Sequence, residues 1–206
     1  MDLFYTVISA IGAFIATNID DIFVLMIFFS QVNKGFTAKH IVLGQYLGFI
    51  LLVVLSLVGT FSINFIPEKW VGLLGLIPIY LGIKLFIKGE EEEDETSIIA
   101  KLQSKGGGFY FLNVAFITFA NGGDNIGIYV PFFSTLNLND LVITVITFLI
   151  MVAVWCFLGY RLASFRHVSE ILEKYGRWIV PVVFIGLGLY IMAENNTFSN
   201  LWSLFG

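Results

Sequence analysis

The chain has 206 residues, of which 58% are hydrophobic and only 13% charged, whereas an average soluble domain carries about 25% charged residues. The 22 phenylalanines are more large apolar side chains than the core of a water-soluble chain of this length encloses, so the composition excludes a soluble globular domain and favours a membrane protein in contact with a lipid bilayer. The formal net charge is −4 and no long basic block occurs, which argues against nucleic acid as a partner.

Apolar runs long enough to cross a bilayer fill most of the chain. A hydrocarbon core about 30 Å thick needs roughly 20 apolar residues per helix. The sequence therefore predicts an all-α integral membrane protein with six transmembrane helices and little room for a soluble domain. The expected spans, in chain order, are residues 3–31, 41–63, 70–88, 109–134, 141–163 and 177–194.

Segment 89–108 is the one break in composition, and it opens with six of the 15 acidic residues. We expect it to be a solvated linker between a first half, residues 1–88, and a second half, residues 109–206. Of the 11 lysines and arginines, all except Lys69 fall in loops or helix ends on the linker's side of the membrane. The positive-inside rule then places the linker in the cytoplasm and both termini outside.

The first and fourth runs share a pattern. Residues 13–22 and 115–126 both begin with Ala-Phe-Ile and continue into a group of polar residues that includes aspartate. Because each half has three spans, the second half must cross the membrane in the opposite sense. The sequence thus predicts two inverted three-helix repeats, the arrangement in which secondary transporters bind substrate near the midplane between interrupted helices. We expect the first run to be tilted or locally unwound because of its length, and the fourth to break at Gly122 and Gly123.

Three carboxylates lie deep inside apolar runs: Asp20 and Asp21 in the first and Asp124 in the fourth. On insertion scales an aspartate at a helix centre costs about 2.5–3.5 kcal/mol, and no lysine or arginine lies at a matching depth to offset it. The remaining partners are protons, a bound cation or neighbouring dipoles. Because this cost recurs in two corresponding places, we interpret the three carboxylates as a functional site.

Amide and hydroxyl oxygens accompany these carboxylates. Residues three apart share a face of a helix, so we expect each aspartate to lie beside a polar neighbour. Such oxygen-rich sets suit a divalent cation, and carbonyl groups freed at Gly122 and Gly123 would add ligands. Three carboxylates around a dication leave about one excess negative charge, which a shared proton would cancel. The expected pairs are Thr17 with Asp20, Asn18 with Asp21, and Asn121 with Asp124.

A resemblance to a known family rests on two segments, ATNIDDIFVL at residues 16–25 and ANGGDNIGIYVP at residues 120–131. Together with the size, the six spans and the hydrophilic middle segment, they resemble the cadmium resistance transporter family, part of the lysine-exporter superfamily. The resemblance implies a bacterial plasma-membrane protein that expels divalent cadmium in exchange for protons and has no prosthetic group. It implies that the ion-handling residues are Asn18, Asp20, Asp21, Asn121, Asp124 and Asn125, to which we add Thr17, Thr118, Gly122 and Gly123 as supporting positions.

Other functions remain open at this point. Cadmium prefers soft sulfur ligands and the chain has one cysteine, Cys156, so an oxygen-dominated site would equally suit manganese, zinc or calcium. An amino-acid exporter on the same scaffold would need a base or a helix N-terminus for the substrate's carboxylate. An intramembrane aspartyl protease would need two facing aspartates that share a proton, and a purely structural subunit would leave the three acids unexplained. The oligomeric state is also open, a homo-oligomer included.

Overall fold

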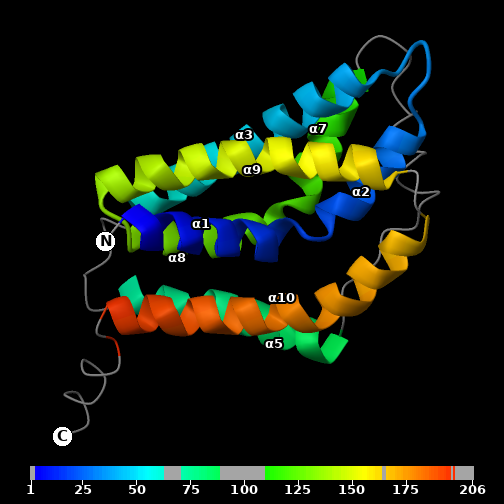
Figure 1. Ribbon diagram of the computed structural model, residues 1–206. Coiled ribbons are helices and arrows are strands. Elements are labelled where there is room, and N and C mark those ends of the chain that lie inside the picture. The colour runs from blue at the N-terminus through cyan, green and yellow to red at the C-terminus, as the bar shows by residue number, and fades with distance from the viewer. Residues whose placement is uncertain (1–2, 63–70, 89–109, 164–165, 196, 198–206) are drawn as a thin grey trace, which may run out of the picture.

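The computed structural model describes residues 3–62, 71–88, 110–163, 166–195 and 197, and these residues form a bundle of helices (Figure 1). No strand occurs in this described part of the chain, in agreement with the predicted all-α class. The acidic linker predicted at 89–108 lies outside the described residues. The elements are α1 (Leu3–Asn18), α2 (Asp21–Ser30), α3 (Ala38–Ser62), η2 (Gly72–Gly75), α5 (Leu76–Lys88), α7 (Tyr110–Asn121), α8 (Gly123–Ser134), α9 (Leu138–Leu162) and α10 (Arg166–Glu194).

Two helices, α3 and α9, are each long and apolar enough to cross a membrane. The pair α1 and α2 qualifies as a third span if the two are taken together, with a bend of 63° between them. Other apolar stretches form shorter helices, at Gly72–Ile87, Tyr110–Asn121 and Val180–Ala193. The described residues therefore support a membrane-embedded helical protein with two to three spans, and the full set of six stays a prediction.

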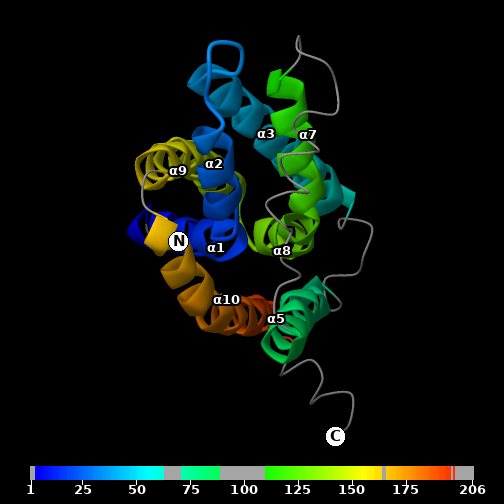
Figure 2. The same cartoon turned by 90° about the vertical axis from the view of Figure 1, so that its right-hand side faces the viewer.

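Each of the two long helices packs against a pair of shorter ones from the other half of the chain. Helix α9 lies along both α1 and α2, while α3 lies along both α7 and α8. Helices α5 and α10 pack side by side and form a layer beneath α1 and α8 (Figures 1 and 2). This reciprocal packing brings the two segments that share a sequence pattern into the middle of the bundle.

Glycines allow the closest helix crossings. A Cβ atom on Gly44 or Gly48 of α3 would lie within 2.7 Å of side-chain atoms of α7, at Val114 and Thr118. This is a Gly-x-x-x-Gly pair, which brings helix backbones together in membranes. Where η2 packs on α10, the carbonyl oxygen of Gly188 would lie 2.4 Å from a Cβ on Gly75. The bundle is thus held by backbone proximity at two separate crossings.

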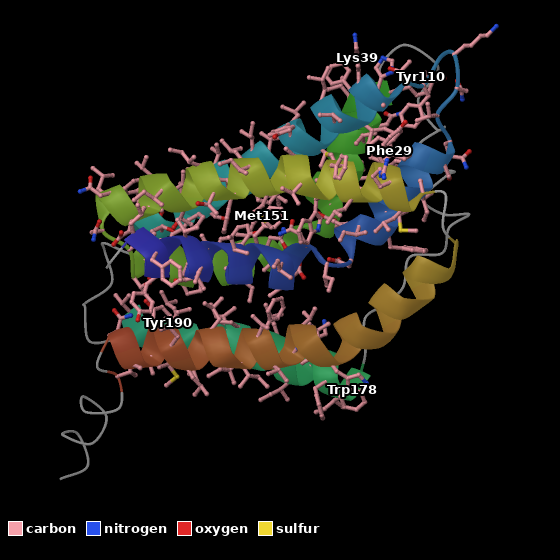
Figure 3. All side chains as sticks on the ribbon, in the orientation of Figure 1. Phe29, Lys39, Tyr110, Met151, Trp178 and Tyr190 are labelled. Carbon is pink, nitrogen blue, oxygen red and sulfur yellow. The ribbon has the colours of Figure 1, made fainter. Side chains whose placement is uncertain are left out.

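Large apolar side chains point outward along the long helices (Figure 3). On α9 they recur about every four residues, as one face of a helix does, and include Val142, Ile146, Ile150 and Phe157. An exposed apolar stripe of this length would promote aggregation in water but is the expected surface in lipid. At the start of α9 the side chain of Asn137 accepts a hydrogen bond from the backbone N–H of Asp140, which caps the helix.

Candidate metal site at two helix breaks

Both predicted interruptions are present in the structure. Helix α1 ends at Asn18 and α2 begins at Asp21, while α7 ends at Asn121 and α8 begins at Gly123. The first break falls at Ile19 and Asp20, residue types with low helix propensity. The second falls at Gly122, where the missing side chain makes room for Leu52 of α3. The first run, expected to be tilted or locally unwound, is interrupted and bent by 63°, and the expected glycine break in the fourth run is confirmed.

A cluster of amide and hydroxyl groups joins the end of α1 to the middle of α8. The side-chain nitrogen of Asn18 donates to the hydroxyl oxygen of Tyr129 over 2.9 Å, and the hydroxyl groups of Thr17 and Tyr129 lie 2.6 Å apart. From α8, the side-chain nitrogen of Asn125 donates to Oδ1 of Asn18 over 3.3 Å. The two segments that resemble each other in sequence therefore meet through polar side chains.

One hydrogen-bond acceptor in this cluster has no donor. Asn125 is 1% exposed, and its Oδ1 atom is buried without a hydrogen-bond partner. An unsatisfied buried acceptor costs about 1–3 kcal/mol, so native structures rarely keep one without a reason. A carbonyl oxygen in this state is a ready ligand for a cation or a donor group.

Aromatic rings enclose the cluster on one side. The ring centroids of Tyr129 and Phe148 lie 4.8 Å apart, and those of Phe14 and Trp155 lie 5.2 Å apart. Phe49 packs on both Phe14 and Tyr129. These buried rings exclude water, which strengthens any electrostatic interaction that the polar groups make.

The three carboxylates are graded in exposure. Asp20 is exposed, Asp124 is half-buried and Asp21 is 7% exposed. Asp21 accepts a hydrogen bond from Nε2 of Gln45 over 3.4 Å, and Oδ1 of Asp124 accepts from the backbone N–H of Asn125 over 2.9 Å. The carboxylates of Asp20 and Asp21 both lie close enough to Asp124 for their charges to repel. The structure thus brings acids from the two breaks into one region.

The expected pairing of neighbours three residues apart stays a prediction. That spacing places residues on one face only of a continuous helix, and the chain breaks between Thr17 and Asp20 and between Asn121 and Asp124. The hydroxyl group of Thr17 contacts that of Tyr129. Asn121 ends α7 and is half-buried.

The supporting positions fall in three different settings. Thr118 donates its hydroxyl hydrogen to Oε1 of Gln45 over 2.7 Å. Gly122 packs tightly on Leu52, whereas a Cβ on Gly123 would meet nothing within 4 Å. Within the described ranges, no group of three or more histidine, cysteine, aspartate or glutamate side chains is arranged to hold a metal ion. A cation here would therefore need amide and hydroxyl oxygens as well as carboxylates.

Sequence reasoning missed Gln45, Tyr129 and Trp155. Gln45 carried a usable signal, since it is an amide within the apolar run 41–63. Tyr129 lies in the segment 120–131 that resembles the family, but nothing there distinguishes it from the other aromatic residues, which make up 17% of the chain. Trp155 donates its indole N–H to the main-chain carbonyl of Asn18 over 2.6 Å, so one carbonyl at the end of α1 already accepts a hydrogen bond from α9.

Helices that break and meet around buried polar groups, inside a bundle with an apolar outer surface, are typical of secondary transporters. The chain matches the family model for cadmium resistance transporters over residues 14–204, which includes both breaks and all three carboxylates. No curated protein and no solved structure is significantly similar to the chain. Because the match spans nearly the whole chain, the protein belongs to the cadmium resistance transporter family.

Proposed function

We propose that this protein exports a divalent cation from the cytoplasm in exchange for protons, with cadmium as the substrate that its family indicates. The observation that carries the proposal is the buried, unpartnered Oδ1 of Asn125, a side chain that bonds to Asn18 at the end of α1 and directly follows Asp124 in the chain. A dication bound there would satisfy this acceptor and neutralise carboxylates that otherwise repel one another.

The three carboxylates differ in solvent exposure, and this difference supports a path for the ion. Asp20 is exposed although it lies between apolar helices, so it faces an aqueous opening rather than lipid in this proposal. Asp124 is half-buried, and Asp21 is buried next to Gln45. The ion meets Asp20 first and is then passed to Asp21, Asp124 and the amides of Asn18 and Asn125.

Proton exchange follows from the cost of charge in the membrane. An empty site with ionised carboxylates is unfavourable in a medium of low polarity. When the dication leaves, protons replace it and restore neutrality. Metal export would then be coupled to proton movement in the opposite direction, without any prosthetic group.

Alternating access would come from the two halves. We assign six spans in two inverted repeats, in which α3 and α9 each brace the broken pair of the other half. Rocking of one repeat against the other would expose the breaks to each side of a bacterial plasma membrane in turn. In this assignment the linker 89–108 is cytoplasmic and both termini are outside.

An amino-acid substrate is less well supported. Its carboxylate would need a base or a helix N-terminus near the site. The N-terminus of α8 holds Asp124 in its first turn, and a negative charge there opposes a second carboxylate. Oxygen ligands accept cadmium, manganese, zinc and calcium, so transport of all four ions should be compared.

The test uses purified protein in inside-out vesicles loaded with a metal-sensitive dye and a pH-sensitive dye. Addition of cadmium should fill the vesicles with metal and make their interior more alkaline. Asp20→Asn, Asp21→Asn and Asp124→Asn should each insert normally yet lose flux to background. Asp140→Asn is the matched control, because Asp140 is also buried but accepts from Thr6 at the far end of α1, and it should retain flux.

Three results would overturn parts of this proposal. Wild-type flux in all three site variants would remove the carboxylates from transport. Metal flux with an unchanged internal pH would remove proton exchange. Saturable transport of lysine or threonine, with no response to any of the four metals, would replace the substrate class.

A further inference from the structure

Gln45 lies where α3 and α7 cross closely. It stands between Gly44 and Gly48, and a Cβ on Gly48 would lie 2.6 Å from the carbonyl oxygen of Ala115 in α7. This approach brings the glutamine within reach of Thr118, one helical turn beyond Val114. The close packing of the two helices therefore also allows a hydrogen bond between their side chains.

The two ends of the Gln45 carboxamide are both used. Its Nε2 donates to Oδ2 of Asp21 over 3.4 Å, and its Oε1 accepts from the hydroxyl of Thr118 over 2.7 Å. All three side chains are buried, with Gln45 itself 4% exposed. The glutamine thus connects an acid at the first break to the helix that precedes the second break.

The hydrogen bond between Gln45 and Thr118 can form with the amide of Gln45 in either of two orientations. A carboxamide carries a donor end and an acceptor end, and a hydroxyl group can either donate or accept. A half-turn of the amide about its last bond would place N–H on Thr118 and C=O toward Asp21, and the Thr118 hydroxyl would accept instead of donate. Both orientations keep the bond to Thr118, so the turn costs little.

The charge at Asp21 decides between the two orientations. With no cation present, the N–H end faces the carboxylate, as the structure shows. A dication held by Asp21 would repel that N–H end and attract the carbonyl end. The amide would then become an oxygen ligand, in a site where the carboxylates are too few and too scattered to complete a coordination shell.

We propose that Gln45 is a ligand of the transported dication, which turns its carbonyl oxygen to the ion and is held in place by Thr118. This inference rests on the proposed function, namely that a dication binds at Asp21. It also connects occupancy of the site to the α3–α7 crossing, because the two packed helices share the hydrogen bond that changes direction.

Direct metal binding tests this assignment. Cadmium binding to the purified full-length protein in detergent is measured by titration calorimetry, and transport is measured in the vesicles described above. Gln45→Leu should weaken binding at least about tenfold, the effect expected when a group that completes or orients a metal site is lost, and it should raise KM more than it lowers the maximal rate. Gln45→Glu supplies an oxygen but no N–H, and it should bind cadmium at least about tenfold more tightly than Gln45→Leu.

Control variants separate ligation from packing. Ser56→Ala removes a buried hydroxyl from the same helix that bonds only within it, to the carbonyl of Leu52, and it should bind cadmium as the wild type does. Thr118→Ser keeps the hydroxyl and should weaken binding less than Thr118→Val. In difference infrared spectra, cadmium should shift side-chain amide carbonyl bands, and the shifted intensity should be smaller in Gln45→Leu than in the wild type, because only the contributions of Asn18 and Asn125 remain.

The outcomes are distinct. Wild-type affinity in Gln45→Leu, or equal losses in Gln45→Glu and Gln45→Leu, would overturn the ligand assignment while leaving the proposed function intact. If the wild type binds none of cadmium, manganese, zinc and calcium, the proposed function fails and this inference fails with it. A tenfold loss in Gln45→Leu, recovered in Gln45→Glu and absent in Ser56→Ala, would support both.

Discussion

The two helix breaks have the same position in their segments but are built from different chemistry. The first contains no glycine, and groups from two other helices hold it: Trp155 of α9 donates to the carbonyl of Asn18, and Gln45 of α3 donates to Asp21. The second is a single residue, Gly122, and its acid Asp124 accepts from the next backbone N–H along its own helix.

This difference implies different roles for the surrounding residues. The first break depends on hydrogen bonds that partner helices supply, so changes in α3 and α9 should reach it. The second depends on an absent side chain, because Leu52 of α3 fills the space beside Gly122. Substitutions at the first break should therefore act through lost polar contacts, and those at the second through crowding.

Gly122→Ala should lower the stability of the protein more than a change at the first break does. The added Cβ would lie 2.1 Å from Cδ1 of Leu52, a side chain that is 1% exposed and has little room to move. Overpacking of this kind costs about 1–3 kcal/mol, which thermal unfolding in detergent would register as a lower midpoint. The double variant Gly122→Ala with Leu52→Ala should recover part of the lost stability. If the double variant instead loses as much stability as the two single variants lose together, crowding is not the cause.

Trp155→Phe should have an intermediate effect. Phenylalanine keeps an aromatic ring against Phe14 but cannot donate to the carbonyl of Asn18, and a typical hydrogen bond contributes about 1 kcal/mol. We expect a modest loss in thermal stability together with slower metal flux, because the end of α1 is no longer held. The same measurements on Gly122→Ala would show whether flux responds to the first break more than to the second.

Trp178→Phe is the matched control for that variant. Trp178 is exposed on α10 and packs edge-on to Phe86 at a centroid distance of 5.6 Å, at the outer side of the α5–α10 layer (Figure 3). Its loss should leave stability within about 0.5 kcal/mol of the wild type. If the two tryptophan variants lose stability and flux to the same extent, the hydrogen bond to Asn18 is not what makes Trp155 important.

The sequence predicted the breaks better than it predicted what holds them. Aspartates in an apolar run are visible without any structure, and so is a glycine pair, because their cost depends on residue type and depth alone. The groups that support them depend on which helices cross. Trp155 and Tyr129 are two of many aromatic residues, and only the packing of α9 and α8 against α1 identifies them.

The pairing of Thr17 with Asp20 is difficult to predict for a related reason. Helical spacing is a guide only within a continuous helix, and here the chain is interrupted between Asn18 and Asp21 and bends by 63°. Spacing is informative inside α1 or inside α2, but not from one of them to the other. In chains of this kind, a predicted break should be placed first and periodicity counted separately on each side.

Gly123→Ala is the smallest change and the most direct check on crowding at the second break, because the two glycines are adjacent but differ in their surroundings. A Cβ on Gly123 would meet nothing within 4 Å, and Gly123 is the first residue of α8. Alanine is favoured over glycine by about 1 kcal/mol inside a helix and by less at its end, so the variant should unfold at the same temperature as the wild type or slightly above it. If Gly123→Ala lowers the midpoint as much as Gly122→Ala does, then backbone flexibility of the Gly-Gly pair, and not contact with Leu52, explains why the second break contains glycine.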